Sequence, residues 1–490
     1  MRDFVDLPLA LDRGAPVALA VQLGDQLRGG IRAGALKAGE RLPSSRGLAL
    51  LLGVSRTVVT EAFQQLYAEG WLEGRHGSGT YVADLAQLGA ASPAPAAATR
   101  AAATGASAVP AAAAGHPDGA PGAELPRPGA GPDGQSVPAP AGMVDLRPGK
   151  PWVRDYDQAA WRRAWRAAAG LPPADFVDPY GHPRLRELLA EHLRRARAVP
   201  VGPENVMVTR GTGHGLDLIA AALLRPGDRA GVEEPGYRVA RTVFASRGGR
   251  VVPCPVDAQG VVPEGLPAGL RVLFTTPAHQ FPLGGRLPIP RRERLLAWAR
   301  STGATVVEDD YDAEFRYDVA PLPALYGLDP ERVVLLGTLS KSLAPNVGIG
   351  WLVAAPPLLA RIAALRGLLG DRTSGPVQEA VSLLLERGDL DRHLRRMRLE
   401  YARRRAAIVE LLGPRVSGDS AGLHVFLPLP PERVDPLIAA AAARGVLLDT
   451  TARHHHGPVR TFGLVVGYGS ASLADVRRAC AVLAGLIDGG

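Results

Sequence analysis

The chain has 490 residues, more than one hydrophobic core usually supports, so at least two folded units are expected. Hydrophobic residues make up 46% of the chain, which excludes complete disorder, and Cys254 and Cys480 form no CxxC pair typical of a zinc site or disulfide framework. The formal net charge of +8 is compatible with a polyanionic partner but does not identify one.

The sequence predicts a soluble, cytoplasmic protein that has no contact with a membrane. The first residues carry acids within a short apolar stretch, which is not the pattern of a signal peptide. No apolar run approaches the roughly 20 residues that are needed to span a bilayer.

Composition divides the chain into three segments. Residues 1–83 have the mixed composition of a small folded unit, whereas residues 84–142 are dominated by Ala, Pro and Gly. Because this middle segment has few large apolar side chains to bury and many prolines, we expect a flexible linker. In residues 143–490, short aliphatic runs alternate with helical patterns, which predicts an α/β fold with a mainly parallel sheet.

The first segment carries the pattern of a helix-turn-helix. A first helix is predicted over Pro16–Arg32, where apolar residues recur at four-residue spacing, and a short second helix over Arg46–Leu51 follows a Pro-Ser-Ser cap. Gly53 makes the turn, and Ser55 caps a third helix over Arg56–Glu69. In such a motif the last helix enters the major groove, and its N-terminal residues contact bases and phosphate.

Four short runs of this segment carry a family signature: Gly39-Glu40-Arg41-Leu42-Pro43-Ser44-Ser45-Arg46, Leu52-Gly53-Val54-Ser55-Arg56-Thr57, Ala68-Glu69-Gly70-Trp71-Leu72 and Gly77-Ser78-Gly79-Thr80. In order and spacing they resemble the GntR family of winged-helix repressors, with a two-stranded wing over residues 71–82. The resemblance implies that DNA is contacted by Arg46, by Ser55, Arg56 and Thr57, and by the wing tip, His76 and Gly77. For Arg41, a structural role and a phosphate contact both stay open.

Two motifs of the third segment could hold an anion and a ring. The strand Val206–Thr209, a glycine-rich turn and a helix over Leu216–Leu224 form an anion site, because free N–H groups and the helix dipole point at one spot. The turn Pro235-Gly236-Tyr237 presents an aromatic ring, which packing explains better when the turn is read alone.

Acids and a lysine follow two further predicted strands. The run Glu308-Asp309-Asp310-Tyr311-Asp312 follows the strand Ala304–Val307, at the edge where parallel sheets bind ligands. Adjacent carboxylates there need a cation, such as a protonated pyridine nitrogen, although a solvated acidic loop explains the run equally well. Lys341 follows the strand Val333–Leu336 among small residues, where burial would lower the pKa of its ammonium group and favour Schiff-base formation. An exposed lysine is the alternative.

Two further runs accompany these motifs along the chain, Pro179-Tyr180-Gly181 and Thr276-Pro277-Ala278-His279-Gln280. Together they resemble the fold-type I pyridoxal-phosphate enzymes of the aminotransferase superfamily. The resemblance implies that Lys341 forms the Schiff base with pyridoxal 5'-phosphate and that Asp309 pairs with its pyridine nitrogen. It also implies that Tyr311 hydrogen-bonds the ring hydroxyl, that Tyr237 stacks on the ring, and that the phosphate is held by Gly211, Thr212 and Thr338.

With its two halves combined, the chain is identified as a member of the MocR/PdxR regulator family. The resemblance implies a homodimeric transcriptional regulator that binds a double-stranded DNA operator and senses pyridoxal 5'-phosphate or an adduct of it with an amine. Two alternatives stay open, namely a catalytically active aminotransferase and an apo scaffold that senses another ligand.

Several positions depart from the aminotransferase pattern. Gly348 stands where tight binders of the cofactor place a phosphate-gripping arginine, a loss on the order of 1.5–3 kcal/mol. Valine stands where the substrate-carboxylate arginine is expected in Leu464-Val465-Val466-Gly467, and Phe281 replaces an asparagine. These losses argue against efficient amino-acid turnover. The run His454-His455-His456 is expected to line the ligand entrance or to lie on a loop, because consecutive histidines cannot all face one metal ion.

Overall fold

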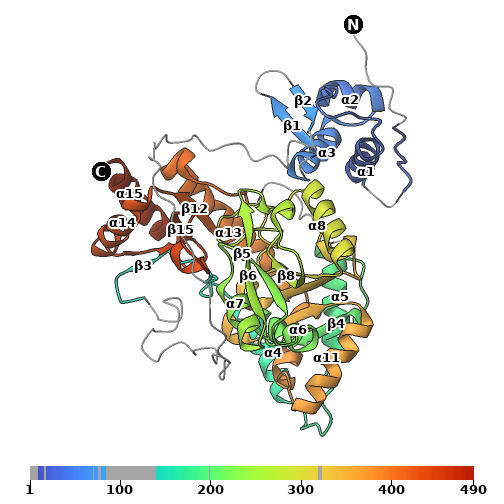
Figure 1. Ribbon diagram of the computed structural model, residues 1–490, viewed down its shortest axis with the longest axis vertical. Helices are drawn as coiled ribbons and strands as arrows, with labels where there is room; N and C mark the ends of the chain where they lie inside the picture. The colour runs from blue at the N-terminus through green and yellow to red at the C-terminus, as the bar shows by residue number, and fades with distance from the viewer. Residues whose placement is uncertain are drawn as a thin grey trace, which may run out of the picture.

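The computed structural model describes residues 9–15, 18–69, 71–75, 79–83, 139–197, 199–317 and 323–489. The predicted wing-tip contacts His76 and Gly77, and residues 84–138 of the predicted linker, lie outside these ranges. Figure 1 shows a small helical unit near the N-terminus and a larger α/β body that contains the C-terminus.

The N-terminal unit is a winged helix-turn-helix, as the sequence predicts. Its elements are α1 (Leu19–Arg32), α2 (Ser45–Leu52), α3 (Arg56–Glu69), β1 (Leu72–Arg75) and β2 (Gly79–Val82), and the two strands pair antiparallel. The Ser44 hydroxyl accepts a hydrogen bond from the Gly47 N–H at 3.1 Å, which caps α2, and Gly53 ends that helix with φ +62°. Helix α1 begins three residues later than predicted, because Ala18 has an extended backbone.

A small hydrophobic core holds this unit together. Leu23 and Leu27 of α1, Leu66 of α3 and Trp71 before the wing are all almost completely buried. Ile289, at the start of helix α8 in the body, belongs to the same cluster of buried side chains, so the two units touch there.

The body is built on a mixed eight-stranded sheet that is mainly parallel. Its strands lie in the order β4 (Val206–Thr209), β11 (Gly350–Val353), β10 (Val333–Thr338), β9 (Thr305–Asp310), β8 (Leu270–Thr275), β5 (Arg229–Glu234), β6 (Arg250–Asp257) and β7 (Gly260–Val261). Strands β10, β9, β8, β5 and β6 are parallel, whereas β11 and β7 run antiparallel to their neighbours. The predicted α/β architecture is therefore confirmed.

Helices cover both faces of this sheet. One buried cluster joins the sheet to α6 (Thr212–Leu223), α7 (Arg238–Ser246) and α11 (Pro356–Leu369). A second cluster joins it to α5 (Pro183–Arg197), α8 (Ile289–Thr302), α12 (Gly375–Glu386) and α13 (Asp389–Leu412). The remaining helices of this part are α4 (Gln158–Ala169) and the short α9 (Leu325–Leu328) and α10 (Leu339–Ser342).

The C-terminal part adds a smaller antiparallel sheet. Strands β12 (His424–Pro428), β15 (Gly463–Gly467) and β14 (Asp449–Thr450) lie in that order, packed with α14 (Pro431–Ala443) and α15 (Leu473–Asp488). Strand β13 (Val446–Leu447) pairs with β3 (Val144–Asp145), so the chain that enters the body is tied at once to its C-terminal part.

Two element boundaries correct the sequence analysis. The acids Glu308 to Asp310 were predicted to follow a strand, but they lie inside β9, because the parallel pairing with β10 continues as far as Asp310 and Gly337. Helix α6 begins at Thr212, four residues before the predicted start. Gly215 is needed there for close packing rather than for a turn, because a Cβ at this position would lie 2.6 Å from the Leu336 side chain.

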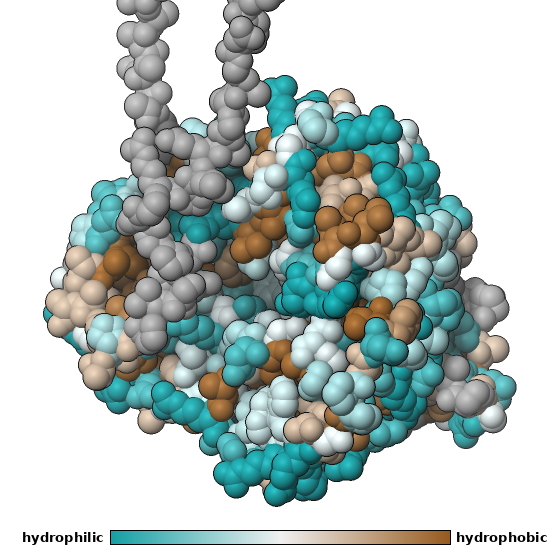
Figure 2. Space-filling model, turned by 90° about the horizontal axis from the view of Figure 1, so that it is seen from below, coloured by the Kyte–Doolittle hydropathy of each residue, from teal (hydrophilic) through white to brown (hydrophobic). Residues whose placement is uncertain are grey.

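Among the described residues, none of the helices is long and apolar enough to cross a membrane. The face of the molecule in Figure 2 shows separate hydrophobic patches interspersed with hydrophilic residues.

Candidate functional site

A cavity of about 470 Å³ opens at the carboxyl ends of the parallel strands, the edge where such sheets bind ligands. The structure brings together on its wall all the residues that the sequence assigns to a cofactor: Gly211, Thr212, Tyr237, Asp309, Tyr311, Thr338 and Lys341. They follow or end four different strands, so the sheet topology rather than any local motif assembles them.

Lys341 lies on the one-turn helix α10, directly after β10. Its Nζ donates a hydrogen bond to the Gly149 carbonyl at 2.6 Å. Burial lowers the pKa of its ammonium group, and the negative charges of Asp309 and Asp312 oppose that shift. A neutral amine is therefore easier to form here than on an exposed lysine.

Asp309 is the acid of the β9 run that reaches the cavity. Its side chain is buried, and its Oδ1 accepts a hydrogen bond from the Thr212 hydroxyl at 3.3 Å. Burial raises the pKa of Asp309 to about 8, and the nearby Asp310 carboxylate adds to the shift, while Thr212 and Lys341 reduce it. A cation brought against this carboxyl group would stabilise its ionised form.

Opposite these groups, backbone and hydroxyl donors form a cradle. Gly211 caps α6 with φ +106°, and its backbone approaches closely enough that a Cβ would lie 3.5 Å from Thr338 Oγ1. The Thr338 and Ser340 hydroxyl oxygens lie 3.0 Å apart, and the Ser340 N–H donates to Thr338 Oγ1 at 3.1 Å. The helix N-terminus and these hydroxyl groups suit a phosphate.

Aromatic rings form the remaining wall. Tyr237 stacks at a centroid distance of 6.0 Å on Phe274 and meets the edge of Phe281 at 6.3 Å. The Tyr311 hydroxyl donates to the His279 carbonyl at 2.9 Å and lies 3.1 Å from His279 Nδ1. Burial raises the pKa of both tyrosines, so both hydroxyl groups stay protonated.

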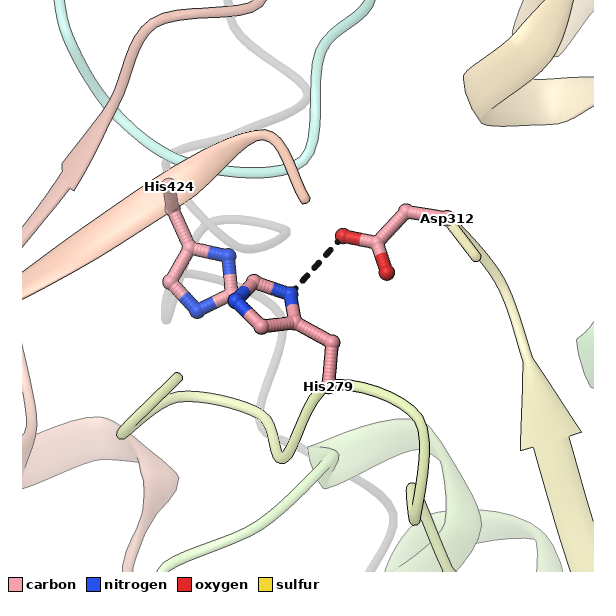
Figure 3. Close-up of side chains that lie close together, drawn as sticks. All are labelled: His279, Asp312 and His424. Atoms are coloured by element: carbon pink, nitrogen blue, oxygen red, sulfur yellow. Dashed lines mark hydrogen bonds and ion pairs between the residues drawn. The ribbon is translucent and has the colours of Figure 1, made fainter. Parts of the chain in front are cut away.

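His279, Asp312 and His424 form a buried cluster (Figure 3), and His424 lines the cavity. Their nitrogen and oxygen ligand atoms lie within 4.8 Å of one another, which is the composition and spacing of a metal site. However, His279 Nδ1 is engaged by an Asp312 carboxylate oxygen at 3.0 Å and by the Tyr311 hydroxyl. Burial also lowers the pKa of His424, so its ring is neutral. These hydrogen bonds favour a role in positioning Tyr311.

Several residues of the wall were given no role in the sequence analysis, among them Ser340, Arg210, Lys150 and His424. Ser340 adjoins Lys341 and could have been found from that motif, and Arg210 directly precedes the glycine-rich turn. Lys150 and His424 come from distant segments that carry no recognisable motif, so only the fold reveals them.

Three positions that depart from the family pattern lie in different surroundings: an open turn, a buried strand and the cavity wall. Gly348 has φ +59°, and a Cβ there would meet no atom within 4 Å. Val465 and Val466 are buried in β15, paired with β12. Phe281 lines the cavity.

The histidine run has both buried and exposed members. His454 and His455 are buried, and the His454 ring meets the edge of Phe281 at 4.9 Å, whereas His456 is exposed. His454 Nε2 lies 3.3 Å from Asp449, and His455 Nδ1 lies 2.9 Å from the Thr451 carbonyl, so the two rings have different partners.

The second site is the exposed start of α3. Arg46, Ser55, Arg56 and Thr57 are all exposed, and Arg56 Nε donates to Ser45 Oγ at 3.3 Å, which ties α3 to α2. The Ser55 hydroxyl accepts from the Val58 N–H at 3.4 Å, as expected of a cap. Arg41 forms an isolated backbone bridge with Tyr81 of the wing, which establishes a structural role for its backbone.

The fold and the cavity define an aminotransferase-like domain that carries a winged helix-turn-helix. Residues 153–469 match the family "Aminotransferase class I and II", and residues 19–82 match "Bacterial regulatory proteins, gntR family". Among solved structures, an archaeal alanine:glyoxylate aminotransferase shares the fold with a TM-score of 0.66 and 23% identity over 72% of this chain and 92% of that one.

Two relatives match this chain across both of its halves. The chain is 36% identical to the HTH-type pyridoxine biosynthesis transcriptional regulator PdxR of Corynebacterium glutamicum over 470 residues, 95% of each chain. It is 35% identical to the probable rhizopine catabolism regulatory protein MocR of Rhizobium meliloti over 483 residues, 96% of this chain and 94% of that one. The chain therefore belongs to the MocR/PdxR-type family of HTH-type transcriptional regulators.

Proposed function

We propose that this transcriptional regulator senses pyridoxal 5'-phosphate, or an adduct of it with an amine, in the cavity around Lys341. One observation carries the proposal: a buried amine with a lowered pKa and a buried carboxyl group with a raised pKa face one cavity. Neither group is stable there as an isolated charge, so the pair suits a ligand that consumes the amine and supplies a cation.

The residues present fit this cofactor. Pyridoxal 5'-phosphate supplies an aldehyde carbon that condenses with a primary amine with loss of water, and it carries a basic ring nitrogen and a phosphate. Lys341 Nζ would be the amine that condenses with the aldehyde. The Asp309 carboxylate would accept a hydrogen bond from the protonated ring nitrogen. Tyr311 would donate to the ring hydroxyl, Tyr237 would cover the ring, and the phosphate would lie in the cradle of Gly211, Thr212 and Thr338.

The winged helix would read the operator. Arg56 and Thr57 would contact base edges in the major groove, and Arg46 and Ser55 would contact the phosphate backbone. We propose that residues 1–83 form the DNA-binding domain, 84–142 the linker and 143–490 the effector domain. A homodimer would match two operator half-sites, since two-fold operators suit two-fold proteins.

A short path joins the two sites. The segment between β8 and α8 lines the cavity with Thr276 and Phe281, and it leads directly to Ile289, which contacts the core of the winged helix. A ligand that moves this segment would change the position of the DNA-binding unit.

Reductive labelling tests the proposal directly. The chain has three lysines, Lys37, Lys150 and Lys341, so borohydride treatment after addition of the cofactor gives a readily mapped pattern. We expect a pyridoxyl label on Lys341 and not on Lys37, which serves as the control within the same molecule. Absence of label on Lys341 would contradict the proposal and favour a scaffold for another ligand.

An operator shift assay tests the regulatory half. With upstream DNA, the cofactor should change the affinity of the wild type and leave that of Lys341→Ala unchanged. An active aminotransferase is the second candidate, because Lys341 and Asp309 are both present. Sustained keto-acid release from amino donors, abolished in Lys341→Ala, would establish that activity.

A further inference from the structure

The phosphate cradle of the proposed cofactor site needs a cation that position 348 does not provide. The donors of the cradle are the N-terminus of α6 and the hydroxyl groups of Thr338 and Ser340, all of them neutral. A phosphate carries up to two negative charges, and burial against neutral donors alone is costly. Gly348 is an open left-handed turn with no side chain to offer.

The pairing of β4 with β11 brings Arg210 close to position 348, where the arginine is missing. The last antiparallel pair joins Gly350 to Thr209. Continuing the same count places Arg210 beside Ile349 and Gly211 beside Gly348. The two turns also touch, because a Cβ on Gly350 would lie 2.7 Å from the Gly211 Cα. Arg210 therefore directly follows β4 and lies one residue from the position opposite Gly348, where the family pattern places an arginine.

Arg210 is available to move toward the cradle. Its side chain is 47% exposed, and it lines the cavity. Its Nη1 bonds the Asp371 carboxylate and the Arg372 carbonyl, the latter at 2.9 Å, and no contact of its Nε or Nη2 is found among the described residues. A guanidinium has five N–H donors, so it can bind a phosphate while it keeps one of these contacts.

Asp371 does not depend on Arg210 alone. Its Oδ2 also lies 3.0 Å from Arg366 Nε and 2.9 Å from His214 Nε2. Arg366 cannot serve the phosphate itself, because its Nη1 is fixed on the carbonyls of Pro179 and Val208 at 2.7 and 2.9 Å. Asp371 therefore keeps the Arg366 guanidinium as a partner when Arg210 turns toward the phosphate.

Two lysines also line the cavity wall, and Asp145, the carboxylate that pairs with one of them, is bonded by Arg147 as well. Lys150 Nζ is paired with Asp145 at 2.8 Å, and Lys341 is the amine that the proposed function assigns to the aldehyde. Among the described wall residues, Arg210 is the one arginine.

We propose that Arg210 is the phosphate-binding cation of this protein and replaces, from the turn after β4, the arginine that is missing at position 348. The inference rests on the proposed binding of pyridoxal 5'-phosphate in this cavity. It predicts a site that discriminates between the phosphorylated aldehyde and pyridoxal, the same aldehyde without phosphate.

Equilibrium titration of the full chain with the two aldehydes, followed by visible absorbance, tests this role. In Arg210→Gln, the dissociation constant for pyridoxal 5'-phosphate should rise about tenfold to a hundredfold, the range of a charged hydrogen bond of about 1.5–3 kcal/mol. The constant for pyridoxal should change by less than about threefold. Arg210→Lys, which keeps the charge, should lie between wild type and Arg210→Gln.

Arg372→Gln is the matched control, because it removes an exposed arginine from the loop that Arg210 contacts. It should leave both constants within about threefold of wild type. The inference fails alone if wild type binds pyridoxal 5'-phosphate and Arg210→Gln binds it equally well, or if that variant loses both aldehydes equally. Wild type that forms no covalent complex with either aldehyde would instead overturn the proposed function.

Discussion

The two candidate sites of this chain use charge in opposite ways. At the start of α3 the functional side chains, Arg46 and Arg56 among them, are exposed and stay fully hydrated until a partner arrives. In the cavity, Asp309 is buried and Lys341 is partly buried, and burial shifts the pKa of each toward its neutral form. The first arrangement costs the fold little, whereas the second stores unfavourable interactions that a ligand can relieve.

This difference in burial predicts which mutations change ligand or DNA binding without changing stability, and which change both. At the winged helix, loss of an exposed arginine should affect DNA binding and leave stability nearly unchanged, since exposed substitutions change stability by roughly 0.5 kcal/mol or less. In the cavity, loss of a functional side chain should alter stability and ligand binding in opposite directions. Three experiments test this contrast.

The largest effect is expected from Arg56→Ala. A side chain that pairs with a base edge contributes roughly 1–3 kcal/mol, so operator affinity should fall about tenfold to a hundredfold. The melting temperature and the visible spectrum with cofactor should match those of wild type. Fluorescence anisotropy with a labelled operator measures the loss, and Lys37→Ala is the control for removal of one exposed positive charge. Equal losses in both variants would show that Arg56 acts only through bulk charge.

Local motifs predicted the winged helix better than the cavity. Helix α3, with Ser55 as its cap, was found from a turn glycine and helical spacing, which are short-range signals. In the cavity, Asp309 was identified, but its place inside β9 was not, because strand length depends on pairing with β10. His424 could not be predicted at all, since β12 reaches the cavity only through long-range packing.

An intermediate effect is expected from Asp309→Asn in the cofactor-free protein. The folded pKa of about 8 lies above the ordinary value of 3.8, so the folded state holds this proton more tightly than the unfolded state. Stability from Asp309 is therefore fully present below about pH 4 and is lost as pH rises toward 8. The asparagine variant lacks this loss, and even one unit of the shift corresponds to about 1.4 kcal/mol in its favour at pH 8.

Thermal melting across this pH range checks the prediction. The two proteins should have similar stability near pH 4, and the variant should become the more stable one as pH approaches 8. Cofactor should reverse the order, because asparagine cannot supply the negative charge that a protonated ring nitrogen needs. A constant difference at every pH would mean that Asp309 is ionised in the free protein.

The smallest effect is expected from the loss of one serine helix cap in each of the two units. The Ser44 hydroxyl accepts from the Gly47 N–H at the start of α2, and the Ser472 hydroxyl accepts from the Asp475 N–H at the start of α15, each at 3.1 Å. Loss of such a cap costs about 1 kcal/mol. Calorimetry should show Ser44→Ala lowering only the transition of the winged helix and Ser472→Ala only that of the body. If either variant lowered both transitions together, the two units would unfold as one. The contact at Ile289 would then couple the unfolding of the winged helix to that of the body, and the two candidate sites would not differ in stability.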